Sequence, residues 1–134
     1  MSHSPGPGAV GRIALGAEGE ARAAAFLEGR GYRIVARNVR AGGVEMDIVA
    51  RRGPLIVFAE VKTRRTRSSV APEAAVDRRK QARLIRGAAA WLRAHPGVAR
   101  RVRFDVIVCE PGGRADDPWQ VRHIQSAFDA SESY

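Results

Sequence analysis

Residues 55–62 read Leu-Ile-Val-Phe-Ala-Glu-Val-Lys, five apolar residues followed by two charged ones that flank a valine. The apolar and β-branched content predicts a buried strand. Because side chains alternate between the two faces of a strand, we expect Glu60 and Lys62 on one face and Val61 on the other. Of the 23 basic residues, only Lys62 and Lys80 are lysine. A compact ammonium held beside a carboxylate on a rigid strand indicates a chemical site.

The elements around this strand follow from hydrophobic periodicity and turn residues. Residues 51–54 predict a turn that joins the strand to an earlier one, and Asp77 is a good N-cap for a following helix. The expected helices cover residues 13–28 and 78–94, and the other expected strands cover 32–38, 44–50, 102–109 and 119–124. This order predicts an α/β sandwich around a mixed sheet of four to five strands.

The chain of 134 residues is long enough for one domain with one core. We expect a disordered leader over residues 1–11, a folded domain over 12–128 and a frayed tail over 129–134. No stretch approaches the roughly 20 apolar residues that span a bilayer, and residues 1–8 lack the basic and apolar regions of a secretion signal, so we do not expect secretion. The single cysteine, Cys109, lies in an apolar run and is expected in the core of a cytoplasmic protein.

The net charge of +9 is unevenly distributed. Residues 30–67 hold ten basic and three acidic residues, and residues 78–103 hold nine basic and none acidic. A basic middle favours a polyanionic partner, with nucleic acid first and an anionic membrane surface second. The alternative is that the arginines only keep the protein in solution.

Three carboxylates are expected to converge with Lys62. If residues 51–54 form a four-residue turn, Ala50 pairs with Leu55 and Glu45 lies opposite Glu60, with Asp47 diagonal to it. Carboxylates so close repel one another unless a cation lies among them, and Mg²⁺ prefers such oxygen ligands. The arrangement suits metal-dependent hydrolysis of phosphodiesters, in which a lysine can assist the attacking water.

Two helical residues extend this candidate site, and each residue has a structural alternative. Glu20 lies on the apolar stripe of the first helix, where burial is costly without a partner, but it could instead serve the helix dipole or an arginine. Gln81 could hydrogen-bond a site water or cap its own helix. Asp47 could pair with an arginine at a strand edge, Glu45 could be an ordinary exposed acid, and Glu60 with Lys62 could form a surface ion pair.

Taken together, the motifs resemble the PD-(D/E)xK nuclease superfamily and, more narrowly, the YraN-like family of bacterial proteins. The motifs are Gly16-Ala17-Glu18-Gly19-Glu20, Gly31-Tyr32, Val44-Glu45-Met46-Asp47-Ile48, Phe58-Ala59-Glu60-Val61-Lys62-Thr63-Arg64, Lys80-Gln81, Arg103-Phe104-Asp105-Val106 and Ala127-Phe128. One departure stands at Val44, where that family usually has glycine.

The resemblance implies a restriction-endonuclease-like fold, which is a three-layer α/β/α sandwich. It implies Asp47 and Glu60 as metal ligands, Lys62 as the catalytic lysine and Glu20 as a supporting acid. Mg²⁺ or Mn²⁺ would be the cofactor, and the substrate would be DNA. Branched or damaged DNA is the expected form, because archaeal junction resolvases, which the chain resembles, act on such structures. RNA is a less favoured substrate, and a homodimer is expected by analogy only.

Phosphate contacts are expected from basic residues that follow the central strand or begin the second helix: Arg64, Arg65, Arg67, Arg78, Arg79 and Lys80. Such contacts set affinity without specifying sequence. The alternative to an enzyme is a non-catalytic module on a nuclease fold, which would bind nucleic acid or a partner protein.

Overall fold

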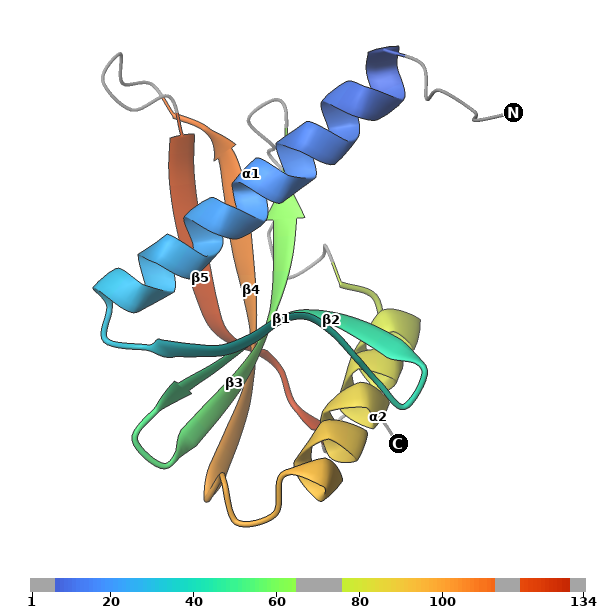
Figure 1. The fold of residues 1–134 in the computed structure, drawn as a ribbon, viewed down its shortest axis with the longest axis vertical. Coiled ribbons are helices and arrows are strands. Elements are labelled where there is room, and N and C mark those ends of the chain that lie inside the picture. Colours follow the sequence, from blue (N-terminus) through green and yellow to red (C-terminus); the bar gives the residue numbers. More distant parts are fainter. Residues whose placement is uncertain (1–6, 65–75, 113–118, 131–134) are drawn as a thin grey trace.

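The computed structural model describes residues 7–64, 76–112 and 119–130, which form two helices and five strands (Figure 1). In chain order these are α1 (Pro7–Gly29), β1 (Arg33–Ala41), β2 (Val44–Arg52), β3 (Leu55–Thr63), α2 (Arg78–Ala94), β4 (Arg101–Pro111) and β5 (Trp119–Phe128). The expected order of helix, three strands, helix and two strands is confirmed.

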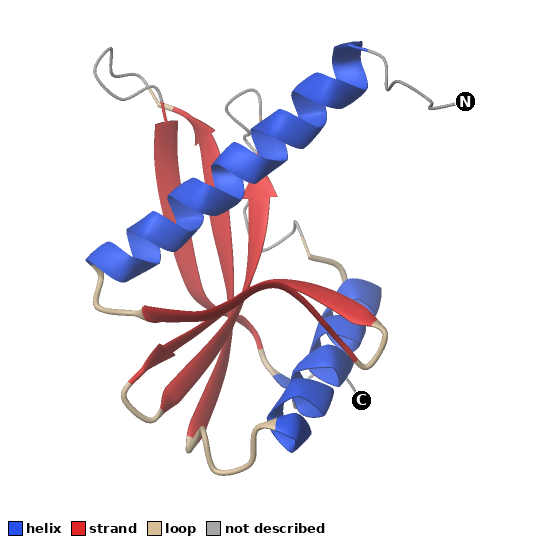
Figure 2. Cartoon of the chain, viewed as in Figure 1, coloured by secondary structure: helices blue, strands red, loops and turns tan. Residues whose placement is uncertain are grey.

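The strands form one sheet in the order β1-β2-β3-β4-β5. All neighbours are antiparallel except β3 and β4, which are parallel and are connected through α2. A parallel pair needs such a long crossover, whereas the other connections can be hairpins. The sheet is strongly twisted, and α1 runs diagonally across one face while α2 lies on the other (Figures 1 and 2). The α/β class with a mixed sheet is confirmed, and the layering is compatible with a restriction-endonuclease-like fold.

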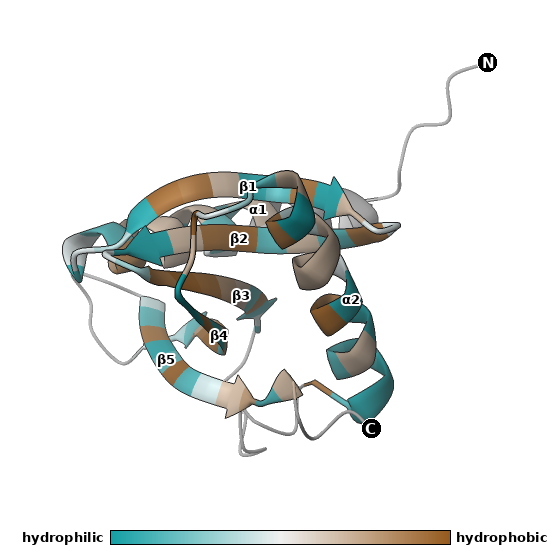
Figure 3. Ribbon diagram, turned by 90° about the horizontal axis from the view of Figure 1, so that it is seen from below, coloured by the Kyte–Doolittle hydropathy of each residue, from teal (hydrophilic) through white to brown (hydrophobic). Residues whose placement is uncertain are grey.

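Each face of the sheet buries its own apolar cluster. The cluster under α1 includes Ala23, Leu27 and Ile107, and the cluster under α2 includes Phe58 and Trp91. β2 and β3 contribute to both clusters, as expected for strands that are covered on both sides. Hydropathy colouring shows a long apolar stretch on β3, whereas β2 carries polar residues between its apolar ones (Figure 3).

The alternation predicted for the end of β3 is confirmed. Val61 packs against the α1 cluster, while Glu60 forms an ion pair with Lys80 of α2 on the opposite face. Asp77 is also confirmed as the N-cap of α2, because its carboxylate accepts a hydrogen bond from the Lys80 amide at 2.9 Å. Cys109 is a fully buried free thiol.

Several elements are longer than their sequence patterns suggest. α1 begins at Pro7, within the stretch where a leader was expected, and residues 1–6 lie outside the described residues. β5 continues to Phe128 because that ring stacks on Phe104 with the centroids 4.9 Å apart. This contact holds the end of β5 against the sheet beyond the point where its alternating pattern weakens.

The valine at position 44 has a matching gap in α2. Val44 is buried, and Gly87 of α2 packs directly onto it. A Cβ atom at Gly87 would lie 3.0 Å from Val44 Cβ, which is closer than side chains normally approach. The absence of a side chain at Gly87 therefore lets α2 lie against a strand that carries a bulky residue.

Among the described residues, neither helix is both long enough and apolar enough to cross a membrane.

Candidate active site

The β2–β3 hairpin has a tighter turn than its sequence suggested. Arg52 pairs with Leu55, so the turn consists of Gly53 and Pro54 alone. Gly53 has φ of +58°, a conformation that favours glycine and closes the chain in two residues. The predicted pairing of Ala50 with Leu55 is therefore wrong by two residues. A shift of two preserves the face of every side chain, and it ends the β2–β3 ladder at Ile48 and Ala59, which leaves Asp47 next to the end of β3.

At Asp47, β2 breaks the regular alternation of its side chains between the two faces of the sheet. Val49, two residues after Asp47, packs into the α2 cluster. Met46, the residue before Asp47, packs into the same cluster. Strict alternation cannot place positions 46 and 49 on one face. The β1–β2 ladder skips the pair at this point, and Asn38 of β1 has a left-handed φ of +50° there. The twist therefore separates Asp47 from the regular ladder and makes its carboxylate available to β3.

This break in alternation also moves Glu45 away from the position expected for it. Glu45 is exposed, and in the strand register it lies opposite Arg40 of the outer strand β1. It does not lie opposite Glu60. The predicted convergence of three carboxylates on one hairpin face is wrong, because it assumed unbroken alternation along β2. Glu45 remains an untested metal ligand with an exposed position.

The Asp47 carboxylate is held against the end of β3. Its Oδ2 accepts a hydrogen bond from the Val61 N–H at 2.8 Å. Burial, followed by the charge of Glu60, raises the pKa of Asp47 to about 7, and the nearby charge of Glu20 adds to this rise. The Val61 hydrogen bond acts in the opposite direction because it favours the charged form. Asp47 thus gives up its proton less readily than an ordinary aspartate does.

Glu60 is the buried centre of the cluster, with 8 % exposure. Its Oε1 lies 2.5 Å from Lys80 Nζ and 3.5 Å from Lys62 Nζ, so both lysines of the chain approach one oxygen. A narrow gap of about 10 Å³ lies beneath it, lined mainly by apolar residues such as Met46 and Leu84. The apolar base makes the carboxylate costly to leave unpaired, and the two ammonium groups offset that cost.

The two lysines have different electrostatic environments. Burial lowers the pKa of Lys62, and the neighbouring Lys80 adds to this effect. Burial also acts to lower the pKa of Lys80, but hydrogen bonding with Glu60 and Lys62 outweighs it and raises that pKa. Lys62 is therefore the more readily deprotonated of the two, which is the property of a lysine that accepts a proton.

Glu20 reaches this cluster because α1 passes very close to the end of β3. A Cβ atom at Gly19 would overlap the Thr63 side chain, and the Gly19 carbonyl accepts a hydrogen bond from Cys109 Sγ at 3.3 Å. Glu20 is the next residue and is partly buried. Its charge acts on Asp47, so Glu20 lies within electrostatic range of that carboxylate, although the three acids do not form a metal-binding group among the described residues.

The remaining predicted residues divide into two groups. Gln81 Nε2 donates a hydrogen bond to the Val76 carbonyl at 2.9 Å, which ties the first turn of α2 to the residue before its N-cap. Arg64, Arg78 and Arg79 are exposed, whereas Lys80 lies on Glu60 and not free in solvent. The candidates Arg65 and Arg67 lie outside the described residues.

The donor set for a metal is small. Across residues 7–64, 76–112 and 119–130, no group of three or more His, Cys, Asp and Glu side chains is arranged to hold a metal ion. Asp47 and Glu60 lie close enough for their charges to repel, and Glu20 repels Asp47 more weakly. Two carboxylates are a sufficient protein contribution for Mg²⁺, which often keeps several waters and binds substrate phosphates at its other positions.

A second polar cluster lies on the α1 face and was not predicted as a site. Asp105 is fully buried and accepts two hydrogen bonds from Arg103, each 2.9 Å long. His123 Nε2 lies 2.6 Å from the same carboxylate, and Arg103 also donates to the Tyr32 hydroxyl at 2.5 Å. Arginine and aspartate two residues apart in an apolar strand indicate one shared polar face, and this signal was available in the sequence.

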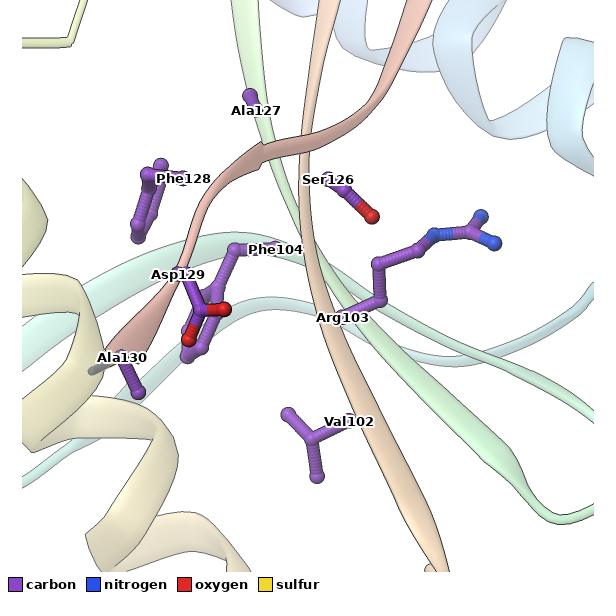
Figure 4. A pocket seen from close by; sticks show the side chains of 8 residues that line it. All are labelled: Val102, Arg103, Phe104, Ser126, Ala127, Phe128, Asp129 and Ala130. Atoms are coloured by element: carbon purple, nitrogen blue, oxygen red, sulfur yellow. The ribbon is translucent and has the colours of Figure 1, made fainter. Parts of the chain in front are cut away.

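One hollow in the described part of the chain lies beside this second cluster and is lined in part by Arg103. It has a volume of about 430 Å³ and lies between the start of β4 and the end of β5 (Figure 4). Its walls include Val102, Phe104 and Phe128, and neither Asp47 nor Glu60 contributes to it. The candidate active site lies instead at the end of β3, outside this hollow.

Comparison with known proteins relates the whole site to one family. The model of the uncharacterised protein family UPF0102 matches residues 19–109, a range that contains Glu20, Asp47, Glu60, Lys62 and Lys80. A UPF0102 protein of Nitratidesulfovibrio vulgaris (strain DP4) is 43% identical over 122 residues, which cover 91% of this chain and 89% of the relative. A UPF0102 protein of Rhodopseudomonas palustris (strain BisB18) is 44% identical over 130 residues, covering 96% and 90%. One from Symbiobacterium thermophilum is 46% identical over 116 residues, covering 87% and 97%. The chain belongs to the uncharacterised protein family UPF0102.

Proposed function

We propose that this protein is a metal-dependent endonuclease-like enzyme that hydrolyses phosphodiester bonds in DNA. The observation that carries the proposal is the cluster at the end of β3, where Asp47 and Glu60 lie close together beside Lys62. Repelling carboxylates next to a partly buried lysine form a poor structural arrangement but a useful catalytic one. Membership of UPF0102 is consistent with this function and does not establish it.

Asp47 and Glu60 would hold Mg²⁺ or Mn²⁺, and Glu20 would support them from α1. The fit rests on the raised pKa of Asp47, since a site that penalises two negative charges gains free energy from a bound cation. When bound, the ion would supply Lewis-acid stabilisation of charge that develops on the phosphate. The Val61 N–H keeps Asp47 Oδ2 directed at the end of β3.

Lys62 would act on the attacking water. Burial lowers its pKa, so its ammonium gives up a proton more readily than an exposed lysine would. Its position on a rigid strand, 3.5 Å from Glu60, fixes the direction from which it approaches substrate. A neutral Lys62 could accept a proton from water, and a charged Lys62 could stabilise the phosphate.

Exposed arginines near the cluster support a nucleic-acid substrate. Arg64 follows β3 directly, and Arg78 and Arg79 lie in the first turn of α2 beside Lys80. α2 carries no acidic residue that would repel phosphate. Contacts of this kind make binding steeply salt-dependent, and a flat salt response would count against the proposal. DNA is favoured over RNA, and a cytoplasmic location and a homodimer remain predictions.

The experiment is a cleavage panel with Mg²⁺ or Mn²⁺ on linear, single-stranded, nicked, flapped and four-way-junction DNA. Wild type is compared with Lys62→Ala, and Glu28→Gln serves as a control at an exposed carboxylate. Cutting by wild type and the control, with loss of at least about 100-fold in Lys62→Ala, would support the proposal. Equal cutting by Lys62→Ala would exclude the assigned role of Lys62.

A non-catalytic binding module is the second candidate. Two observations favour it: the described residues lack a three-ligand metal group, and Lys80 already neutralises Glu60 without any metal. Such a module would bind DNA equally well after Glu60→Ala and in the absence of divalent ions. No cutting of any substrate, with binding intact, would favour this candidate over the enzyme.

A further inference from the structure

Lys80 contacts one of the two carboxylate oxygens of Glu60, the group that a divalent cation would also bind. We propose that Lys80 is a built-in counter-cation that holds Glu60 in the metal-free protein and weakens the affinity of the site for divalent metal. The inference rests on the proposed function, because it concerns the same two carboxylates. It assigns Lys80 to control of the site and not to the phosphate-binding surface where its sequence context placed it.

The geometry distinguishes Lys80 from Lys62. Both ammonium groups approach Glu60 Oε1, but Lys80 Nζ is at 2.5 Å, a charge-assisted hydrogen bond, while Lys62 Nζ is at 3.5 Å. Lys80 therefore makes the strong contact. A cation that binds Glu60 through this oxygen has to displace Lys80 first.

Lys80 is also the lysine that can leave. Its side chain is 40% exposed, whereas that of Lys62 is 19% exposed. The Lys80 backbone is fixed by its hydrogen bond to Asp77, so only the flexible side chain has to move. An ammonium on four methylene groups can swing into solvent without disturbing α2.

The charge balance points the same way. Asp47 and Glu60 contribute two negative charges when both are ionised, and the two positive charges of Lys62 and Lys80 offset them, with Glu20 as a further acid nearby. A divalent ion added to the intact cluster would lie beside two ammonium groups and be repelled by both. Removing the Lys80 charge leaves one repelling ammonium and frees Oε1 of Glu60.

The test measures metal binding and not catalysis. Mn²⁺ is titrated calorimetrically at pH 8 into the full chain of wild type, Lys80→Met and Arg79→Met. Arg79 is an exposed neighbour on the same helical turn, so its variant controls for the loss of one positive charge. We expect Lys80→Met to bind Mn²⁺ roughly tenfold to hundredfold more tightly than wild type, since a hydrogen bond to a charged group no longer competes. Arg79→Met should stay close to wild type.

Two further variants keep the result interpretable. Lys80→Gln removes the charge while retaining a polar side chain, and it should also tighten Mn²⁺ binding. It takes the place of Lys80→Met in the test if that variant folds poorly. Lys80→Arg keeps the charge and should not tighten it. Tighter binding by Lys80→Arg as well would overturn the inference, because the cause would then be packing and not charge.

The outcomes separate this inference from the proposed function. Binding by the neutral variants alone, with none by wild type, would support the inference in its strongest form. Equal Mn²⁺ affinity in wild type and the neutral Lys80 variants would overturn it and leave the metal site intact. No Mn²⁺ binding by any variant would overturn both the inference and the metal-dependent enzyme.

Discussion

Replacing Asp47 by asparagine should stabilise the metal-free protein at alkaline pH. The folded-state pKa of about 7, against an ordinary value of 3.8, means that the folded protein binds this proton more tightly than the unfolded chain does. The stabilising contribution is fully present below the unfolded pKa and is lost as pH rises through about 7. The difference between the two pKa values corresponds to at most about 4 kcal/mol of folding stability, since each tenfold change in proton affinity is worth about 1.4 kcal/mol. Asparagine never ionises, and its side-chain oxygen can still accept the Val61 hydrogen bond.

The assay is urea denaturation of wild type and Asp47→Asn at pH 4.5, 7 and 8.5, with chelator present. We expect the stability difference, variant minus wild type, to grow by roughly 2–4 kcal/mol from the lowest to the highest pH. The exposed carboxylate variant Glu45→Gln should show little such trend. A difference that stays constant with pH, or an Asp47→Asn protein that is less stable than wild type at pH 8.5, would refute the reasoning. Added Mn²⁺ should stabilise wild type at pH 8.5 and have a smaller effect on Asp47→Asn.

Three other predictions concern parts of the fold that support the site. Gly19→Ala should cost about 1–3 kcal/mol of stability, because the added methyl group forces α1 away from Thr63. Denaturation measures this loss, and an unchanged stability would exclude the close approach. Asp105→Asn should cost about 3–5 kcal/mol of stability because it leaves the Arg103 charge without its partner. This loss should shrink at acidic pH, since the pKa of Asp105 is lowered in the fold. A loss under about 1 kcal/mol would show that the pair contributes little. The Cys109 thiol, fully buried and with its pKa raised to about 11, should resist alkylation at pH 8 until the protein unfolds, and rapid alkylation of the native protein would contradict the packing of α1.

Local pattern was sufficient for much of the architecture. The run at 55–62 predicted β3 and the shared face of Glu60 and Lys62, because a two-residue period is a property of one strand alone. Asp77 was predicted as an N-cap because capping involves only residues three positions apart. The element order and the basic middle were likewise predictable from the chain, since neither depends on how the strands pair.

Register was not predictable in the same way. The hairpin turn was assigned four residues, but Gly53 adopts a positive φ that closes it in two. Both registers place the same side chains on the same faces, so the hydrophobic pattern cannot distinguish them. The break in alternation at Asp47 depends on the twist of β1 against β2 and on the conformation of Asn38. Glu45 left the predicted cluster for that reason.

The sequence by itself determined which residue types were available and which of them shared a strand face. Only the tertiary structure decided that Lys80 meets Glu60, that Glu20 comes within range of Asp47, and that Asp105 is buried beneath α1. These contacts join residues 18 or more positions apart in the chain, as with Asp105 and His123. Their formation depends on how the helices pack on each face of the sheet and on the crossover from β3 to β4. The physical reason is that backbone periodicity acts over a few residues, whereas the position of a charge relative to its partner is set by packing across the whole domain.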